Sequence, residues 1–241
     1  MIGLAIPKQN QAEAMKESRI ILPNELSPSR RAFLTKAMLG SAALFTAPGA
    51  FAELLELTPR QTEGPFYPDK MPLDTDNDLI ILNDKITPAV GEVSYLHGKV
   101  TDAKGTPIPN ALVEIWQVDN NAAYLHTRDP NRKKADANFQ GYGRFSTNLK
   151  GEYFFRTIKP VPYPGRTPHI HVKVSHKGKH LLTTQCYVKG HANNARDGLF
   201  RSLGKSTELL EVAFLPLKDS KTGELTAKFD IIVGTTPEDK H

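Results

Sequence analysis

Short runs of residues that are mostly apolar, or alternate between apolar and polar, recur through the C-terminal part of this 241-residue chain. Turn-forming Gly, Pro, Asn and Asp separate these runs. The runs are 95–100, 111–118, 153–158, 169–175, 180–188 and 228–233. They contain no internal repeats or coiled-coil heptads. The pattern predicts an all-β fold, an antiparallel β-sandwich over residues 91–241, preceded by an irregular N-terminal arm at 53–90. Long loops, of the kind that carry function on a rigid sandwich, are expected at 119–150 and 189–226.

The first fifty-two residues have the features of an export signal. The pair Arg30-Arg31 is followed by Phe-Leu and a Lys, then by an uncharged stretch ending in Ala50-Phe51-Ala52, a small-x-small cleavage site. That stretch is shorter than the roughly 20 apolar residues of a membrane span, so no stable membrane anchor is expected. Residues 1–52 are therefore predicted to be a twin-arginine signal peptide, read by the Tat export machinery and cleaved after Ala52. The mature protein would be periplasmic or secreted. An amphipathic helix with two surface arginines is the alternative.

The excess positive charge of the chain is concentrated in the same segment. The formal net charge is +5, and residues 1–52 contribute three of those charges. No aromatic side chains interleave with a basic patch as they do in nucleic-acid binders, so no nucleic-acid partner is expected. The single cysteine, Cys186, excludes an intrachain disulfide and a cysteine-rich zinc site. A metal site in this chain must use His, Tyr or carboxylate ligands.

His169-Ile170-His171 is the sharpest local sign of chemistry, because residues i and i+2 of a strand point to the same face. Both imidazoles would then converge on one point, as two metal ligands do. Just upstream, residues 160–168 contain four prolines, which stiffen a loop that presents Tyr163 and Arg166 beside the histidines. The alternatives are two strand histidines that bind nothing and a loop that is only a rigid connection.

The remaining histidines and the single tryptophan fit plain structural roles. Trp116 is expected in the core, and His97 is expected on a strand face. Exposure to solvent is expected for His126, His176, His180 and His191.

Several motifs occur in an order that resembles the intradiol ring-cleavage dioxygenases, over about residues 58–233. They are Glu114-Ile115-Trp116-Gln117 leading to Tyr124, Gly141-Tyr142-Gly143-Arg144, the run 153–160, Pro162-Tyr163-Pro164, Pro168-His169-Ile170-His171, Thr184-Gln185-Cys186-Tyr187 and Phe229-Asp230-Ile231-Ile232. Ordered motifs are more specific together than any one of them alone. The resemblance implies cleavage of a catechol-type diol by O2, of protocatechuate 3,4- or catechol 1,2-dioxygenase type, giving a cis,cis-muconate-type dicarboxylate.

The resemblance also implies a set of site residues. One non-haem Fe(III) per chain would be held by Tyr124, Tyr163, His169 and His171. Arg166 would lie beside the substrate and Gln185 on the side where oxygen reacts, and Tyr163 would also accept a proton. The implied partners are a small catechol and O2, and a homo-oligomer is compatible with the sequence.

The chain departs from the family pattern at one place. Only five residues separate Tyr163 from His169, fewer than in well-known family members, which predicts a more open pocket.

Two other functions fit parts of the sequence. A periplasmic metal-binding module of copper-carrier or transthyretin-like type would use only His169 and His171. A family member that has lost turnover would keep the fold, but the retained Tyr124 and Tyr163 argue against that reading.

Overall fold

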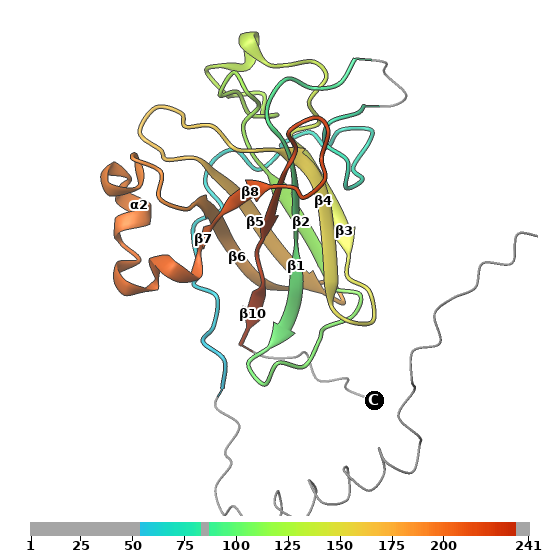
Figure 1. The fold of residues 1–241 in the computed structure, drawn as a ribbon, viewed down its shortest axis with the longest axis vertical. Coiled ribbons are helices and arrows are strands. Elements are labelled where there is room, and N and C mark those ends of the chain that lie inside the picture. Colours follow the sequence, from blue (N-terminus) through green and yellow to red (C-terminus); the bar gives the residue numbers. More distant parts are fainter. Residues whose placement is uncertain (1–53, 83–86, 235–241) are drawn as a thin grey trace, which may run out of the picture. The chain divides into compact units, whose positions relative to one another are not determined.

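Two five-stranded sheets pack face to face in the computed structural model of the chain, which describes residues 54–82 and 87–234. The first sheet contains β1 (Val93–Asp102), β4 (Glu152–Ile158), β8 (Phe214–Pro216), β9 (Leu225–Lys228) and β10 (Ile231–Val233). The second contains β2 (Leu112–Trp116), β3 (Tyr142–Ser146), β5 (His169–His176), β6 (Lys179–Val188) and β7 (Glu211–Val212). Figure 1 shows these layers, with irregular segments gathered beyond one end of the strands. The predicted β-sandwich is confirmed, whereas the predicted export signal lies outside the described residues.

The strand order places β5 in the middle of the second sheet, which runs β3-β2-β5-β6-β7. In the first sheet β1 pairs with β4 along one edge and with β9 and β10 along the other. Neighbours such as β2–β5 and β5–β6 are antiparallel as predicted, but β1 pairs in parallel with β9 and β10, and β6 with β7.

Helical structure in the described part of the chain is limited to α2 (Gly198–Arg201) and the 3-10 turns η1 (Arg132–Lys134), η2 (Asn194–Arg196) and η3 (Gly204–Leu209). No helix there has both the length and the apolar character needed to cross a bilayer.

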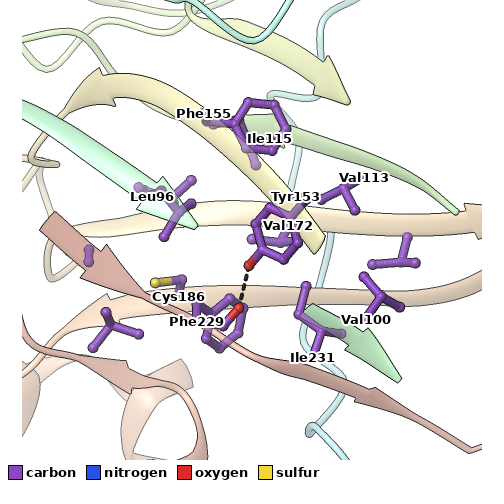
Figure 2. Packing of buried hydrophobic residues seen from close by; sticks show 14 of the residues in the cluster. Leu96, Val100, Val113, Ile115, Tyr153, Phe155, Val172, Cys186, Phe229 and Ile231 are labelled. Carbon is purple, nitrogen blue, oxygen red and sulfur yellow. Dashed lines mark hydrogen bonds between the residues drawn. The ribbon is translucent and has the colours of Figure 1, made fainter. Parts of the chain in front are cut away.

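The hydrophobic core lies between the two sheets and is filled by alternate residues of their strands. Ile170, Val172 and Val174 of β5 are buried in one cluster with Leu96 and Phe155 of the first sheet. Figure 2 shows Val172, Leu96 and Phe155 in this cluster. Complete burial of such a side chain contributes about 1.5–3 kcal/mol. Because side chains alternate along a strand, the residues between these on β5 must lie on the outer face of the second sheet.

The run 228–233, predicted as one strand, is divided between β9 and β10, and the packing around Phe229 explains the break. The backbone N–H of Phe229 donates to the carbonyl of His97 at 2.8 Å, and its carbonyl accepts from the buried phenol of Tyr153 (Figure 2). A Cβ on Gly98 would lie 1.9 Å from that carbonyl oxygen. Residue 98 of β1 must therefore be glycine for the backbone of Phe229 to approach so closely.

Gly98→Ala should therefore destabilise the whole sandwich. The added methyl group meets backbone, which cannot rotate away, so we expect the free energy of unfolding to fall by about 3 kcal/mol. Chemical denaturation checks this, with Gly198→Ala as control, because a Cβ on Gly198 meets nothing within 4 Å. Equal stability of the two variants would contradict the explanation.

Both predicted long loops contain short elements that the pattern did not reveal. Strand β3 lies inside the expected loop 119–150, and α2, β7 and β8 lie inside 189–226. Strands β7 and β8 have two and three residues, too few to show an alternation. Strand β3 follows the positive-φ turn at Gly141 (φ 69°) and pairs with β2 in the register Trp116↔Tyr142.

Residues 54–82, in the predicted arm, contain no helix or extended strand but bind the edges of both sheets. At the edge of β4, Leu79 N–H donates to the carbonyl of Arg156, and Arg156 N–H donates to that of Asn77, each at 2.8 Å. At the edge of β3, Arg144 N–H donates to the carbonyl of Thr75 at 3.1 Å. Covering the edges blocks further strand pairing.

Candidate metal centre

Three neighbouring strands of the second sheet bring functional side chains to its outer face. In the strand register His171 of β5 lies opposite Trp116 of β2 on one side and Gln185 of β6 on the other. His169 is two residues away on the same face, opposite Tyr187. Residues directly opposite one another have Cβ atoms about 5 Å apart, so these side chains must touch.

Four donor atoms converge above this face. The Nε2 atoms of His169 and His171 are 3.2 Å apart, so the two imidazoles meet as the His-x-His spacing predicted. The Tyr124 hydroxyl lies 3.1 Å from His171 Nε2 and 3.5 Å from His169 Nε2. The Tyr163 hydroxyl lies 3.5 Å from that of Tyr124. The structure thus brings together the four residues that the family resemblance indicated.

The spacing and chemistry of these donors fit a metal ion. Ligands bound to one ion through bonds of about 2 Å are about 3 Å from each other, and the observed separations are 3.1–3.5 Å. Within residues 54–82 and 87–234, no group of three or more His, Cys, Asp or Glu side chains could hold a metal ion, so a metal bound beside the two histidines would need the phenols as ligands as well. Two imidazoles and two phenols form a donor set for a transition metal rather than for Mg²⁺ or Ca²⁺.

Burial sets the protonation state of the donors. Burial and the charge of Arg166 lower the pKa of His169 to about 3, and burial with the neighbouring His169 lowers the pKa of His171 well below its usual value. Both imidazoles are therefore neutral at neutral pH and offer a lone pair. Burial, with the adjacent Tyr163, raises the pKa of Tyr124 well above its ordinary value. A metal cation at this point would reverse that preference and favour the phenolate.

The two histidines are oriented in different ways. The Nδ1–H of His169 donates to the carbonyl of Thr167 at 2.7 Å, which leaves Nε2 as the lone-pair donor. His171 Nδ1 has no hydrogen-bond partner in the described part of the chain. Its ring instead stacks on the indole of Trp116, with centroids 4.8 Å apart and planes 7° from parallel. Trp116 is buried as predicted, but it packs against the site rather than in the core between the sheets.

Arg166 and Gln185 lie beside the donors. One terminal nitrogen of Arg166 donates to the Tyr163 hydroxyl at 3.3 Å and the other to Gln185 Oε1 at 2.5 Å. Gln185 in turn donates to the carbonyl of Thr62 in the arm at 2.9 Å. The positively charged guanidinium of Arg166 is thus held beside Tyr163, where it can interact with negative charge on a bound ligand.

The N-terminal arm supplies part of the wall of the metal centre, a role that its sequence pattern did not reveal. Phe66 stacks on Tyr124 with ring centroids 5.0 Å apart, and Tyr67 packs nearly perpendicular to Trp116, also with ring centroids 5.0 Å apart. The Tyr67 hydroxyl donates to the buried carboxylate of Glu114 at 2.7 Å. The signal available was the run Glu63–Pro68, which carries two aromatic residues between prolines.

Two histidines predicted to be exposed are buried. His126 is 3% exposed; its ring packs edge-to-face with Phe66, and its Nδ1 accepts from the backbone N–H of Arg128. His176, at the end of β5, is 9% exposed. His180 is exposed and His191 partly so, in line with the prediction, and His97 lies half-buried on β1 as expected.

Comparison with known proteins adds a family match. A family model described as "Dioxygenase" matches residues 62–233. The protocatechuate 3,4-dioxygenase beta chain of Burkholderia cepacia is 33% identical over 167 residues, which cover 66% of this chain and 71% of that protein. The hydroxyquinol 1,2-dioxygenase of Corynebacterium glutamicum is 30% identical over 145 residues, which cover 53% of this chain and 44% of that protein.

A solved structure shares the fold. The dioxygenase domain of a dioxygenase–carbohydrate-binding protein fusion from Streptomyces sp. SirexAA-E superposes with a TM-score of 0.58 at 28% identity, covering 75% of this chain and 100% of that domain. The chain spans only about half the length of the hydroxyquinol dioxygenases it matches, 44% and 53%.

Proposed function

The chain belongs to the intradiol ring-cleavage dioxygenase family, and we propose that it cleaves a catechol-type diol with O2 between the two hydroxyl-bearing carbons. The product would be a cis,cis-muconate-type dicarboxylate, which contains all atoms of both reactants. The observation that carries the proposal is the convergence of the side chains of Tyr124, Tyr163, His169 and His171.

The metal would be non-haem Fe(III), which the family typically uses. Phenolates are hard anionic donors that favour ferric over ferrous iron, and neutral imidazoles complete the set. When bound, Fe(III) would serve as a Lewis acid that draws charge from the catecholate and makes a ring carbon reactive toward O2. Tyr124, Tyr163, His169 and His171 would hold it.

The two tyrosines differ in a way that suits different roles. Tyr124 is 2% exposed and its backbone N–H donates to the Asp129 carboxylate, so it is fixed from within the protein. Tyr163 is half-buried on the proline-rich loop. A diol must lose both hydroxyl protons to chelate a metal, and we assign one of them to the Tyr163 oxygen, which would then move aside to admit the substrate.

Arg166 supplies fixed positive charge next to that oxygen. Its guanidinium is held by Asp197 at 2.9 Å, Tyr163 at 3.3 Å and Gln185 at 2.5 Å, so little reorganisation is needed when negative charge develops on the substrate. A preorganised donor of this kind contributes about 10²–10³ in rate.

Oxygen uptake by the iron-loaded protein with a panel of catechols tests the proposal. We expect one O2 consumed per diol, and a muconate-type product identified by mass. Iron-free protein that regains no activity after iron loading would overturn the proposal. Copper binding that is unchanged by Tyr163→Phe would favour a metal-binding module instead.

A ring substituent on the substrate would meet a second arginine. A pocket of about 240 Å³, lined by Tyr163, Arg166, Asn193, Arg196 and Asp197 among others, opens from the site between two loops. Arg196 is exposed, and its side chain has no hydrogen-bond or ion-pair partner in the part of the chain that the structure describes. Asp197 is saturated by other partners, so Arg196 is the uncommitted charge of the pocket.

Arg196→Gln should accordingly raise KM for a carboxylated catechol about tenfold, the effect of one lost charge-assisted hydrogen bond. KM for unsubstituted catechol should stay the same. Steady-state kinetics on both substrates check this, with Arg201→Gln at the end of α2 as control. Equal effects on the two substrates would contradict it.

Export through the twin-arginine route remains a proposal that rests on the sequence of residues 1–52. Replacing Arg30 and Arg31 together by lysine should leave the uncleaved precursor in the cytoplasm of a bacterial host. Fractionation and immunoblotting measure this, with Arg19→Lys in the same segment as control. Unchanged export of the double variant would contradict the route.

A further inference from the structure

One buried carboxylate, that of Asp197, joins three segments around the site. It lies immediately before α2, and its side chain is 1% exposed. Oδ2 accepts from Arg166 Nε at 2.9 Å and from the backbone N–H of Thr167 at 2.9 Å. Oδ1 accepts from the backbone N–H groups of Leu199 and Phe200 at 2.9 and 3.1 Å. Each oxygen therefore accepts two hydrogen bonds, Oδ2 from Arg166 and Thr167 and Oδ1 from the first turn of α2.

The first branch leads from Oδ2 to the substrate side of the site. Because the guanidinium is planar, fixing its Nε edge against Asp197 also fixes the direction of its two terminal nitrogens. These donate to the Tyr163 hydroxyl and to Gln185 Oε1. The charge of Arg166 is thus aimed by a partner on its far side.

The second branch leads from the same oxygen to a metal-binding histidine. Asp197 holds the N–H of Thr167, whose carbonyl accepts the Nδ1–H of His169 at 2.7 Å. The Thr167 hydroxyl also donates to Asn194 at 2.6 Å, which anchors the residue from a second side. The Thr167 carbonyl that binds the His169 ring is therefore held in place by residues of the loop that contains Asn194 and Asp197.

Helix capping alone does not explain this arrangement. Capping of α2 needs only Oδ1, whereas Oδ2 carries a buried ion pair and a further backbone bond. Burial by itself would raise the pKa of Asp197, but hydrogen bonds from the Thr167 and Phe200 backbone and from Arg166 bring it below its ordinary value. The carboxylate is therefore charged at neutral pH and pairs with the guanidinium.

We propose that Asp197 is a positioning residue that sets the orientation of Arg166 and of His169 together. The inference rests on the proposed function, in which Arg166 stabilises charge on the substrate and His169 binds iron. A partner that orients a metal ligand typically changes metal affinity or activity 10- to 100-fold when it is lost. Its two effects should be separable, because the branches end at different groups.

A double-mutant cycle tests the Arg166 branch. Asp197→Asn keeps the size of the side chain but removes its charge and one acceptor, so kcat at full iron loading should fall about 10- to 100-fold. In an Arg166→Gln background, again at full iron loading, the same change should cost less than about threefold, because the group through which Asp197 affects kcat is gone. Equal losses in both backgrounds would overturn the proposal.

Iron affinity tests the His169 branch without reference to turnover. Trp116 is the only tryptophan of the chain and stacks on His171, so quenching of its fluorescence reports iron binding. Asp197→Asn should weaken iron binding about tenfold, because the support of His169 is loosened. Unchanged affinity would overturn the proposal that Asp197 orients His169.

Two further variants guard against a trivial loss of folding. Ser202→Ala removes the hydrogen bond from the Ser202 hydroxyl to the Leu199 carbonyl on α2, and it should leave kcat and iron affinity unchanged. An equal loss of kcat and iron affinity in Ser202→Ala would show that both losses follow from weakening α2, and it would overturn the proposal. If Asp197→Asn does not fold, Arg166→Lys keeps the charge but cannot bond Asp197, Tyr163 and Gln185 at once. Its kcat should match that of Arg166→Gln within about threefold, and wild-type kcat in Arg166→Lys would overturn the proposal.

The outcomes also separate this inference from the proposed function. A wild-type protein that binds no iron and cleaves no catechol overturns the proposed function and the inference with it. An active wild type with additive losses overturns the inference alone.

Discussion

His171→Leu should abolish iron binding and ring cleavage together. Leucine fills most of the space of the imidazole but offers no lone pair, so the four converging donors become three. Loss of a partner that only orients a ligand costs 10- to 100-fold, so loss of the ligand itself should cost more than about 100-fold in activity. Iron content after loading, and oxygen uptake with catechol, measure the two losses.

His180→Leu is the matched control for this experiment. His180 is exposed on β6, and its Nε2 forms a hydrogen bond with the Thr183 hydroxyl at 2.8 Å, so iron content and activity should match the wild type. The unfolding free energy of both variants shows whether each is folded. A folded His171→Leu protein that keeps one iron per chain and full activity would contradict the assignment of His171 as a ligand.

Tyr163→Phe should keep the iron but lose turnover. Tyr124, His169 and His171 remain, and only the proton acceptor and displaceable ligand is removed. A general base is worth about 10²–10⁴ in rate, and we expect a fall in kcat of that size. The visible phenolate-to-Fe(III) absorption should weaken as well, because one of two phenolates is missing. Absorption spectra and oxygen uptake on the same samples measure both effects.

Tyr95→Phe is the control for the loss of a phenol. The Tyr95 hydroxyl donates to Glu224 at 2.9 Å on the first sheet, away from the metal centre. Its removal should change neither the absorption nor the rate. Unaltered kcat in Tyr163→Phe would show that another group takes the substrate proton.

Residue patterns alone predicted the sandwich and the histidine pair, because both follow from the two-residue period of a strand. The same period that buries Ile170 and Val172 places His169 and His171 on the outer face, where they meet. Positions of this kind are set locally and can be derived without knowledge of the rest of the chain.

The tyrosines could not be found in this way. Tyr124 lies 45 residues before His169 in the sequence, and irregular loops rather than a period bring it to the site. Its loop is shaped by side-chain bonds to backbone, such as Asp119 accepting from the N–H of Ala123. Only the family resemblance indicates Tyr124 and Tyr163, and the structure places them beside the histidines.

Residues that act through contacts between distant segments were missed altogether. Phe66 reaches Tyr124 because the irregular arm crosses the sheet, and nothing in its local sequence encodes that path. Asp197 is one acidic residue in an apparently plain loop, and its importance appears only when Arg166 and Thr167 are seen on the same carboxylate.

We propose that this site inserts oxygen between the two hydroxyl-bearing carbons of a catechol. Turnover of the iron-loaded protein under ¹⁸O2, followed by mass spectrometry of the product, tests it most directly. We expect a ring-opened dicarboxylate that carries both labelled oxygen atoms. A semialdehyde from cleavage beside the diol, or a quinone without label, would contradict it.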